Sequence, residues 1–180
     1  MPQVILVNEN DEPVGTMEKL AAHQEGILHR AFSIFIFNSK GEMLLQKRAA
    51  KKYHSAGLWS NACCSHPYPG EEVKFAALRR LQEEMGFTSP LEKAFDFVYK
   101  ISFENGLTEN EFDHVFVGTF DGEITANLEE IADYTYRSMA EVKQDLLDKP
   151  AKYTAWFRIA FPKVEEWLEN KRQEAIGNRQ

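Results

Sequence analysis

The residues best suited to chemistry lie in the segment Asn61–Pro67, which reads N-A-C-C-S-H-P. A thiol at Cys64 and an imidazole at His66 stand two residues apart in a turn-like stretch that Pro67 closes, so both can face one pocket. Cysteine chemistry needs a controlled thiol pKa, which a nearby histidine, a metal or a helix N-terminus can supply. Taken alone, the segment fits a buried thiol and a structural turn histidine about equally well.

Two glutamates, Glu109 and Glu111 in the segment E-N-E, form a second candidate. Residues i and i+2 of a strand point to the same face, so the two carboxylates would converge. Like charges so close raise one of the two pKa values unless a cation lies between them. A solvated strand edge is the alternative explanation. With the glutamates, three histidines complete a mixed nitrogen and oxygen ligand set suited to Mn²⁺, Zn²⁺ or Fe²⁺: His23, His29 and His66.

A third candidate is the charged helical segment Arg79–Phe87, which reads R-R-L-Q-E-E-M-G-F. Glu83 and Glu84 occupy its last turn, where negative charge opposes the helix dipole. Arg80 lies three and four residues earlier, and such a surface ion pair offsets this cost only weakly. Carboxylates held on a helix can bind Mg²⁺ and, through it, a diphosphate.

A group of cations could contact diphosphate oxygens, although a basic turn is more often a solvated surface. The group consists of Lys19, Arg48, Lys51 and Lys52.

The elements that must position these groups alternate between strands and helices. Apolar periodicity predicts strands over residues 4–7, 31–37, 43–46, 95–103 and 111–120. Helical spacing predicts helices over 73–85, over 138–147 behind a capping box at 138–141, and over 155–171, bent or interrupted at Pro162. The pattern indicates one mixed α+β domain that covers residues 1–180.

Composition limits the class of protein. A chain of 180 residues with 43% hydrophobic and 27% charged residues can form a hydrophobic core without disulfide bonds or a structural metal. The longest apolar run, Ala31–Phe37, is far shorter than the roughly 20 residues that span a bilayer. Polar residues at 8–12 interrupt any signal peptide. We therefore expect a cytoplasmic protein without a membrane partner.

Charge and cysteine usage agree with this expectation. A formal charge of −7 argues against a dedicated nucleic-acid binder, because such proteins carry a basic face. The two cysteines are adjacent, Cys63 and Cys64, so two reduced thiols are expected.

Read together, these residues resemble the type 1 isopentenyl diphosphate isomerases, a branch of the Nudix superfamily. The resemblance covers residues 4–156 and is most specific at H-R-A-F-S (29–33), W-S-N-A-C-C-S-H-P (59–67) and E-N-E (109–111). A Nudix box falls on residues 65–87 and is matched at Glu71, Arg79, Leu81, Glu83, Glu84, Gly86 and Phe87. The resemblance implies a Nudix-like mixed β-sheet core flanked by helices.

Two positions of the box depart from the pattern. Ser65 replaces a glycine, and Arg80 replaces the glutamate that follows the arginine. Hydrolytic members use the box carboxylates to bind several Mg²⁺ ions, so replacement of this glutamate by Arg80 puts diphosphate hydrolysis in doubt. It suits an isomerase, which must bind a diphosphate without cleaving it.

The resemblance also implies roles for individual residues. Cys64 corresponds to the cysteine that exchanges a proton with the substrate, and Glu111 to the acid/base on the opposite face. Tyr99 would support Glu111, and the ring of Trp156 would face the developing cation. One divalent metal, Mn²⁺ or Zn²⁺, would be held by His23, His29, His66, Glu109 and Glu111. Glu84 would bind a diphosphate-bound Mg²⁺, and the substrate-binding cations would be Lys19, Arg48, Lys52 and Arg80.

The implied activity is interconversion of isopentenyl and dimethylallyl diphosphate, which feeds isoprenoid biosynthesis. The partner would be a small isoprenoid diphosphate, and the oligomeric state stays open. Two alternatives remain, a Nudix diphosphate hydrolase and a catalytically inactive Nudix-like binding module.

Overall fold

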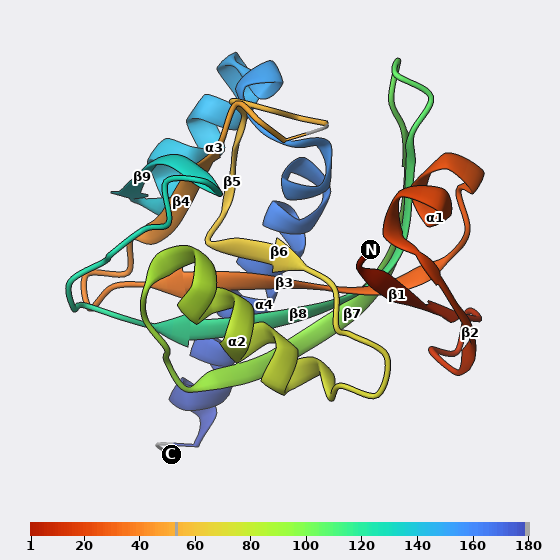
Figure 1. Cartoon of the computed structure of the whole chain (residues 1–180). Helices are drawn as coiled ribbons and strands as arrows, with labels where there is room; N and C mark the ends of the chain where they lie inside the picture. Colours follow the sequence, from red (N-terminus) through yellow and green to blue (C-terminus); the bar gives the residue numbers. More distant parts are fainter. Residues whose placement is uncertain (53, 179–180) are drawn as a thin grey trace.

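The computed structural model describes residues 1–52 and 54–178. Its centre is strand β3 (His29–Phe37), which runs parallel to β8 (Thr108–Thr119), while β8 pairs antiparallel with β7 (Leu91–Ser102). The remaining strands are β1 (Gln3–Val7), β2 (Pro13–Glu18), β4 (Met43–Arg48), β5 (Trp59–Asn61), β6 (Cys63–Ser65) and β9 (Ile131–Arg137). The helices are α1 (Lys19–Glu25), α2 (Val73–Met85), α3 (Met139–Asp148) and α4 (Ala155–Gly177), with a short 3₁₀ turn at Pro150–Lys152. Figure 1 shows α2 and α4 on opposite faces of the central strands.

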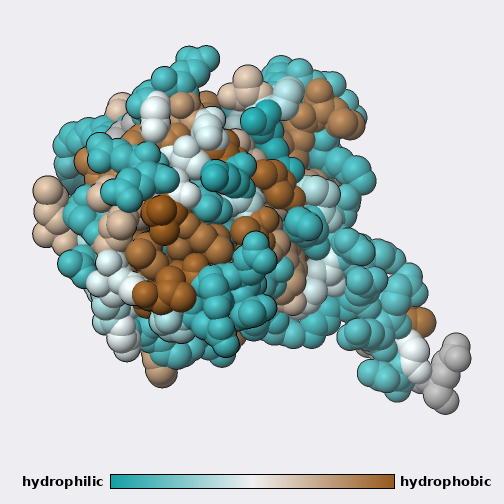
Figure 2. Space-filling view, turned by 90° about the vertical axis from the view of Figure 1, so that its right-hand side faces the viewer, coloured by the Kyte–Doolittle hydropathy of each residue, from teal (hydrophilic) through white to brown (hydrophobic). Residues whose placement is uncertain are grey.

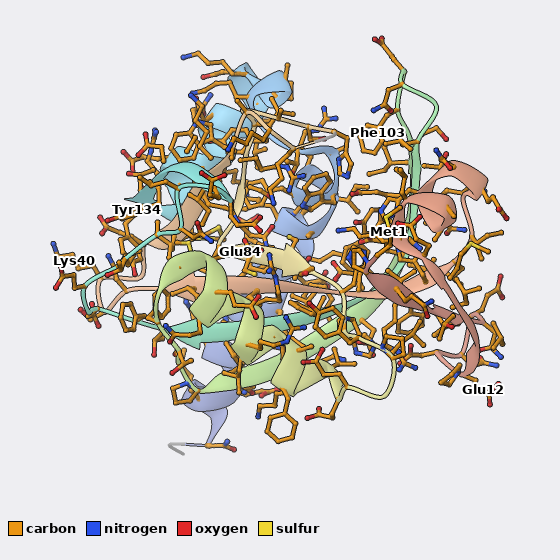
Figure 3. All side chains as sticks on the ribbon, in the orientation of Figure 1. Met1, Glu12, Lys40, Glu84, Phe103 and Tyr134 are labelled. Carbon is orange, nitrogen blue, oxygen red and sulfur yellow. The ribbon has the colours of Figure 1, made fainter. Side chains whose placement is uncertain are left out.

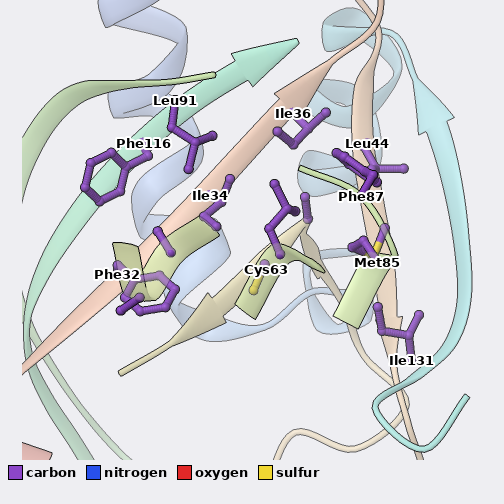
Figure 4. Packing of buried hydrophobic residues seen from close by; sticks show 14 residues of the cluster. Phe32, Ile34, Ile36, Leu44, Cys63, Met85, Phe87, Leu91, Phe116 and Ile131 are labelled. Atoms are coloured by element: carbon purple, nitrogen blue, oxygen red, sulfur yellow. The ribbon is translucent and has the colours of Figure 1, made fainter. Parts of the chain in front are cut away.

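Side chains along β3 pack alternately on the two faces of the sheet, which explains why the longest apolar run of the chain forms the central strand. Phe32, Ile34 and Ile36 pack in the cluster that includes the buried face of α2 (Figure 4). Phe35 and Phe37 pack in the other cluster, which includes Phe157 and Phe161 of α4. A strand covered on both faces carries apolar residues at successive positions. The predicted mixed sheet flanked by helices is therefore confirmed.

The predicted elements are present with shifted ends. Strand β8 begins at Thr108 rather than at residue 111, so both glutamates of E-N-E lie inside it. Ser138 and Glu141 form the predicted capping box of α3. The predicted interruption at Pro162 is wrong, because α4 continues through it to Gly177. A proline removes one helical hydrogen bond, and burial of Phe161 and Val164 on either side offsets this loss.

Five short elements were not predicted: β2, α1, β5, β6 and β9. β5 and β6 have three residues each and α1 has seven, which is too short for a periodicity to develop. β2 is mostly exposed and its described pairing is with β1. The four strands form by pairing: β2 with β1, β5 and β9 with β4, and β6 with β3.

The surface differs from this interior. Figure 2 shows a mostly hydrophilic face with a large group of hydrophobic side chains left of its centre and smaller ones toward the upper right. Within the described part of the chain, no helix combines the length and apolar character needed to cross a membrane.

Candidate active site

Sheet register aligns three of the predicted site residues in one row. His29 opens β3 opposite Glu111 of β8, and Glu111 is opposite Tyr99 of β7. The Tyr99 hydroxyl donates to Glu111 Oε2 at 2.5 Å, and Glu109 Oε2 lies 3.2 Å from the same hydroxyl. The predicted convergence of the two carboxylates on one strand face is thus present.

His23 reaches this row from helix α1. The helix ends at Gly26, whose φ of 64° is a left-handed conformation that glycine adopts at little cost. The side-chain amide of Asn110 donates to the Gly26 carbonyl at 3.0 Å. The middle residue of E-N-E therefore ties the helix that carries His23 to the strand that carries both glutamates.

The third histidine follows β6. This strand pairs antiparallel with β3, and Cys64 is opposite Ser33. Pairing with β3 brings His66 to the same end of the sheet as His29, and His66 Nε2 lies 2.9 Å from Glu111 Oε1.

Four predicted ligands consequently gather around one point. Atoms of His23, His29, His66 and Glu111 that could bind a metal all lie within 4.8 Å of one another. Glu109, the fifth predicted ligand, belongs instead to a neighbouring group with His23 and His54.

Hydrogen bonds set the tautomers of two of these histidines. Nδ1 of His23 lies 2.7 Å from the Lys19 carbonyl, and Nδ1 of His29 lies 2.8 Å from the Ile27 carbonyl. A carbonyl only accepts, so each Nδ1 carries the proton and each Nε2 keeps a lone pair. Both Nε2 atoms lie near Glu111 Oε1, at 4.0 Å for His23 and 3.5 Å for His29.

The pKa values of the Glu109 and Glu111 carboxylates are shifted in opposite directions. Burial opposes ionisation of Glu111, but His66 and His29 hold its pKa well below the usual range. Burial and the charge of Glu111 raise the pKa of Glu109. Burial lowers the pKa of His66 to about 3, so this imidazole is neutral. Lone pairs of neutral histidines beside crowded carboxylates fit a divalent cation, which would relieve the repulsion.

Cys64 lies close to this group but has its own partners. Its thiol donates to Asn61 Oδ1 at 3.1 Å, and Ser33 Oγ lies 3.5 Å from the sulfur. Ser33 in turn donates to the buried Asp113 at 2.7 Å. Burial, and then the Asp113 charge, raise the pKa of Cys64 to about 12. The residue is therefore a protonated thiol at neutral pH.

The predicted substrate-binding residues surround the same pocket. Its lining includes Cys64, Glu84 and Trp156. It also includes all four predicted substrate-binding cations, which are Lys19, Arg48, Lys52 and Arg80. The Arg48 guanidinium lies over the Trp156 ring, 5.1 Å from its centroid. Lys51, the remaining cation of the basic turn, instead pairs with Glu129 at the surface.

Glu84 is buried on α2 near the centre of the molecule (Figure 3). Arg80 donates to it at 2.5 Å and to Glu83 at 2.7 Å, and Gln46 also donates to Glu84. The arginine that departs from the Nudix box therefore neutralises two of the box carboxylates.

One pocket residue was missed by sequence reasoning. His54 is buried, lines the pocket, and has its Nε2 3.3 Å from Glu109 Oε1. It lies in the loop between β4 and β5, in the basic turn from which only Arg48, Lys51 and Lys52 were predicted to contact a substrate. Its position two residues after Lys52 was the one available signal.

Comparison with known proteins agrees with this geometry. Residues 27–157 match the NUDIX domain. An isopentenyl-diphosphate Delta-isomerase 2 from Photorhabdus laumondii is 48% identical over 169 residues, covering 91% of this chain and 96% of that protein. The isopentenyl-diphosphate Delta-isomerase 2 of Aromatoleum aromaticum is 52% identical, covering 90% of this chain and 86% of that protein.

Solved structures share the fold at low sequence identity. The DR0079 protein of Deinococcus radiodurans superposes with a TM-score of 0.75 at 18% identity, covering 89% of this chain and 98% of that one. The MutT protein of Methanosarcina mazei gives 0.65 at 23% identity, covering 80% and 96%. The fold, the domain match and the near full-length identity together show that this chain belongs to the isopentenyl-diphosphate Delta-isomerase family and contains a Nudix domain.

Proposed function

We propose that this enzyme interconverts isopentenyl and dimethylallyl diphosphate. The observation that carries the proposal is one pocket that brings together a His–Glu group able to hold a metal, a tyrosine hydrogen-bonded to its carboxylate, and the Cys64 thiol. Relatives that carry the isomerase name over nearly their whole length support it. A small isoprenoid diphosphate is accordingly the substrate.

The reaction adds a proton to the terminal alkene carbon, which places the cation on the internal alkene carbon, and removes a proton from the methylene carbon attached to that internal carbon. Protonating an unactivated alkene produces a high-energy cation, so a donor and a base must be positioned beforehand. Glu111, hydrogen-bonded to Tyr99, serves one of these roles, and the Cys64 thiol serves the other from the opposite face of the substrate. The Trp156 ring stabilises the desolvated cation by about 2 kcal/mol.

The metal group has a defined set of ligands in this proposal. His23, His29, His66 and Glu111 would hold one divalent cation, Mn²⁺ or Zn²⁺, and Glu109, which groups with His23 and His54, would join them as the fifth ligand. When bound, the cation supplies positive charge that fixes the geometry of Glu111 and stabilises its ionised form.

The other end of the pocket binds the diphosphate. Glu84 would hold a diphosphate-bound Mg²⁺, and the cations that would contact the phosphate oxygens are Lys19, Arg48, Lys52 and Arg80. We propose that the enzyme acts in the cytoplasm. Both cysteines are free thiols, and the role of Cys64 requires it to stay reduced.

Proton NMR of the purified protein with isopentenyl diphosphate and Mg²⁺ in D₂O tests the reaction. We expect dimethylallyl diphosphate with incorporated deuterium and no free phosphate, and no product with Glu111→Gln. Phosphate release without a double-bond shift would instead support the hydrolase. Arg80 stands where the Nudix box has a further glutamate and pairs with Glu83, which argues against that outcome.

A further inference from the structure

His54 contacts both the metal group and the aromatic wall of the pocket. Its Nε2 lies 3.3 Å from Glu109 Oε1. Its ring stacks on Phe103 with centroids 4.9 Å apart and planes 17° apart, and meets Trp156 edge-on at 5.7 Å. Phe103 follows β7 in the hairpin that extends beyond the sheet (Figures 1 and 3). Two aromatic contacts in different directions fix the orientation of the imidazole.

The partners of His54 differ in kind from those of the proposed ligands. His23 and His29 each have a backbone carbonyl at Nδ1, which keeps the proton there and leaves Nε2 as a lone pair. Nδ1 of His54 instead lies 3.4 Å from the Ser55 hydroxyl, which can donate as well as accept. His54 can therefore carry its proton on Nε2 and donate it to Glu109.

His54 is buried and lines the pocket, and its Nε2 lies beside a carboxylate oxygen of Glu109. With its ring proton on Nε2, the imidazole would face this oxygen as a donor. Donation to Glu109 would satisfy both groups inside a buried pocket.

The Glu109 carboxylate needs a hydrogen-bond donor because the hydroxyl beside it is shared with Glu111. Its carboxylate is next to the Tyr99 hydroxyl, but that hydroxyl has one hydrogen and lies closer to Glu111. His54 Nε2 lies 3.3 Å from the other oxygen of this carboxylate, in a group that also includes His23. Ligating carboxylates in metal sites are generally fixed by such hydrogen bonds.

We propose that His54 is a positioning residue whose Nε2–H holds the Glu109 carboxylate toward the group formed by His23, His29, His66 and Glu111. The proposal rests on the metal site described under the proposed function, but not on the isomerase reaction. It makes His54 a partner of a ligand and not a ligand itself.

The test measures metal binding directly. Metal-free protein is titrated with Zn²⁺ in competition with a chromophoric chelator, for the parent chain and two variants. His54→Phe keeps a ring to stack on Phe103 but has no N–H, and we expect affinity to fall about 10- to 100-fold. His54→Gln keeps an N–H donor, and we expect affinity within about threefold of the parent.

A double-mutant cycle with Glu109→Gln separates positioning from ligation. If His54 acts through Glu109, adding His54→Phe to Glu109→Gln lowers affinity little further. If His54 were a ligand, the losses would add and His54→Gln would lose as much as His54→Phe. Either of those results, or full affinity in His54→Phe, overturns the proposal.

Two controls keep the result interpretable. His114→Gln removes a buried histidine that contacts Asp11 and Asp96 outside the pocket, and should leave Zn²⁺ affinity unchanged. Turnover is followed separately by NMR. The expected affinity pattern without isomerisation would refute the proposed function and leave the role of His54 intact.

Discussion

Tyr99 and Glu111 are opposite each other in adjacent antiparallel strands, and the tyrosine hydroxyl donates to the glutamate at 2.5 Å. Burial, and then the charges of Glu109 and Glu111, raise the pKa of Tyr99 well above its usual range, so the hydroxyl keeps its proton. The sheet register alone thus supplies a permanent donor to the carboxylate that is proposed to move a proton.

Tyr99→Phe removes this donor without changing the ring. A hydrogen bond to a charged group contributes about 1.5–3 kcal/mol, so we expect kcat to fall about 10- to 100-fold. Turnover is measured by NMR, and bound metal is measured by elemental analysis of the same sample. Loss of metal in step with activity would contradict a direct role of Tyr99 in proton transfer by Glu111.

The adjacent cysteines provide a matched pair of variants. Cys63 is buried in the core cluster with α2, whereas Cys64 lines the pocket. Cys64→Ala should lower turnover at least about 100-fold, the lower range for loss of a proton-transfer group, with metal content unchanged. Cys63→Ala should retain turnover and lose about 1 kcal/mol of unfolding free energy as a small cavity forms. Equal turnover in the two variants would remove Cys64 from the mechanism.

Metal removal should lower thermal stability. The imidazoles and carboxylate meet only in the folded chain, so a bound cation stabilises that state. Zn²⁺ or Mn²⁺ in about a hundredfold excess over Kd should add about 2.7 kcal/mol to the free energy of unfolding, seen as a rise in Tm over dialysed protein. His29→Ala should abolish the rise. A rise that persists in His29→Ala would place the metal elsewhere.

Arg80→Ala should destabilise the protein. Glu84 is buried and accepts hydrogen bonds from Arg80 and Gln46, so loss of the guanidinium leaves a buried carboxylate with one neutral donor. We expect a loss of about 3 kcal/mol in urea unfolding. Added Mg²⁺ should recover part of it, because the cation would take the place of the guanidinium at Glu84. Arg158→Ala, at an exposed position on α4, is the comparison variant and should change stability little.

Much of the site was predictable because the spacing of its residues is local. Glu109 and Glu111 share a strand face by the two-residue period, and the capping box of α3 follows from four consecutive residues. The resemblance named His23, His29, His66, Cys64 and Trp156, all of which are in or beside the pocket.

Other features depend on contacts between distant segments. Sequence alone could not show that Asn110 ties α1 to β8, or that β6 pairs with β3 so that Cys64 is opposite Ser33. The same pairing directs Cys63 into the core and Cys64 toward the pocket.

The sequence by itself determined the mixed α+β class, the motifs and the residue types of the site, because periodicity and spacing act over a few neighbouring residues. Tertiary structure decided that Glu109 joins His54 in a group beside the four candidate ligands, and that Arg80 binds Glu84. Those relationships arise from strand register and loop placement, which bring together side chains far apart in the chain.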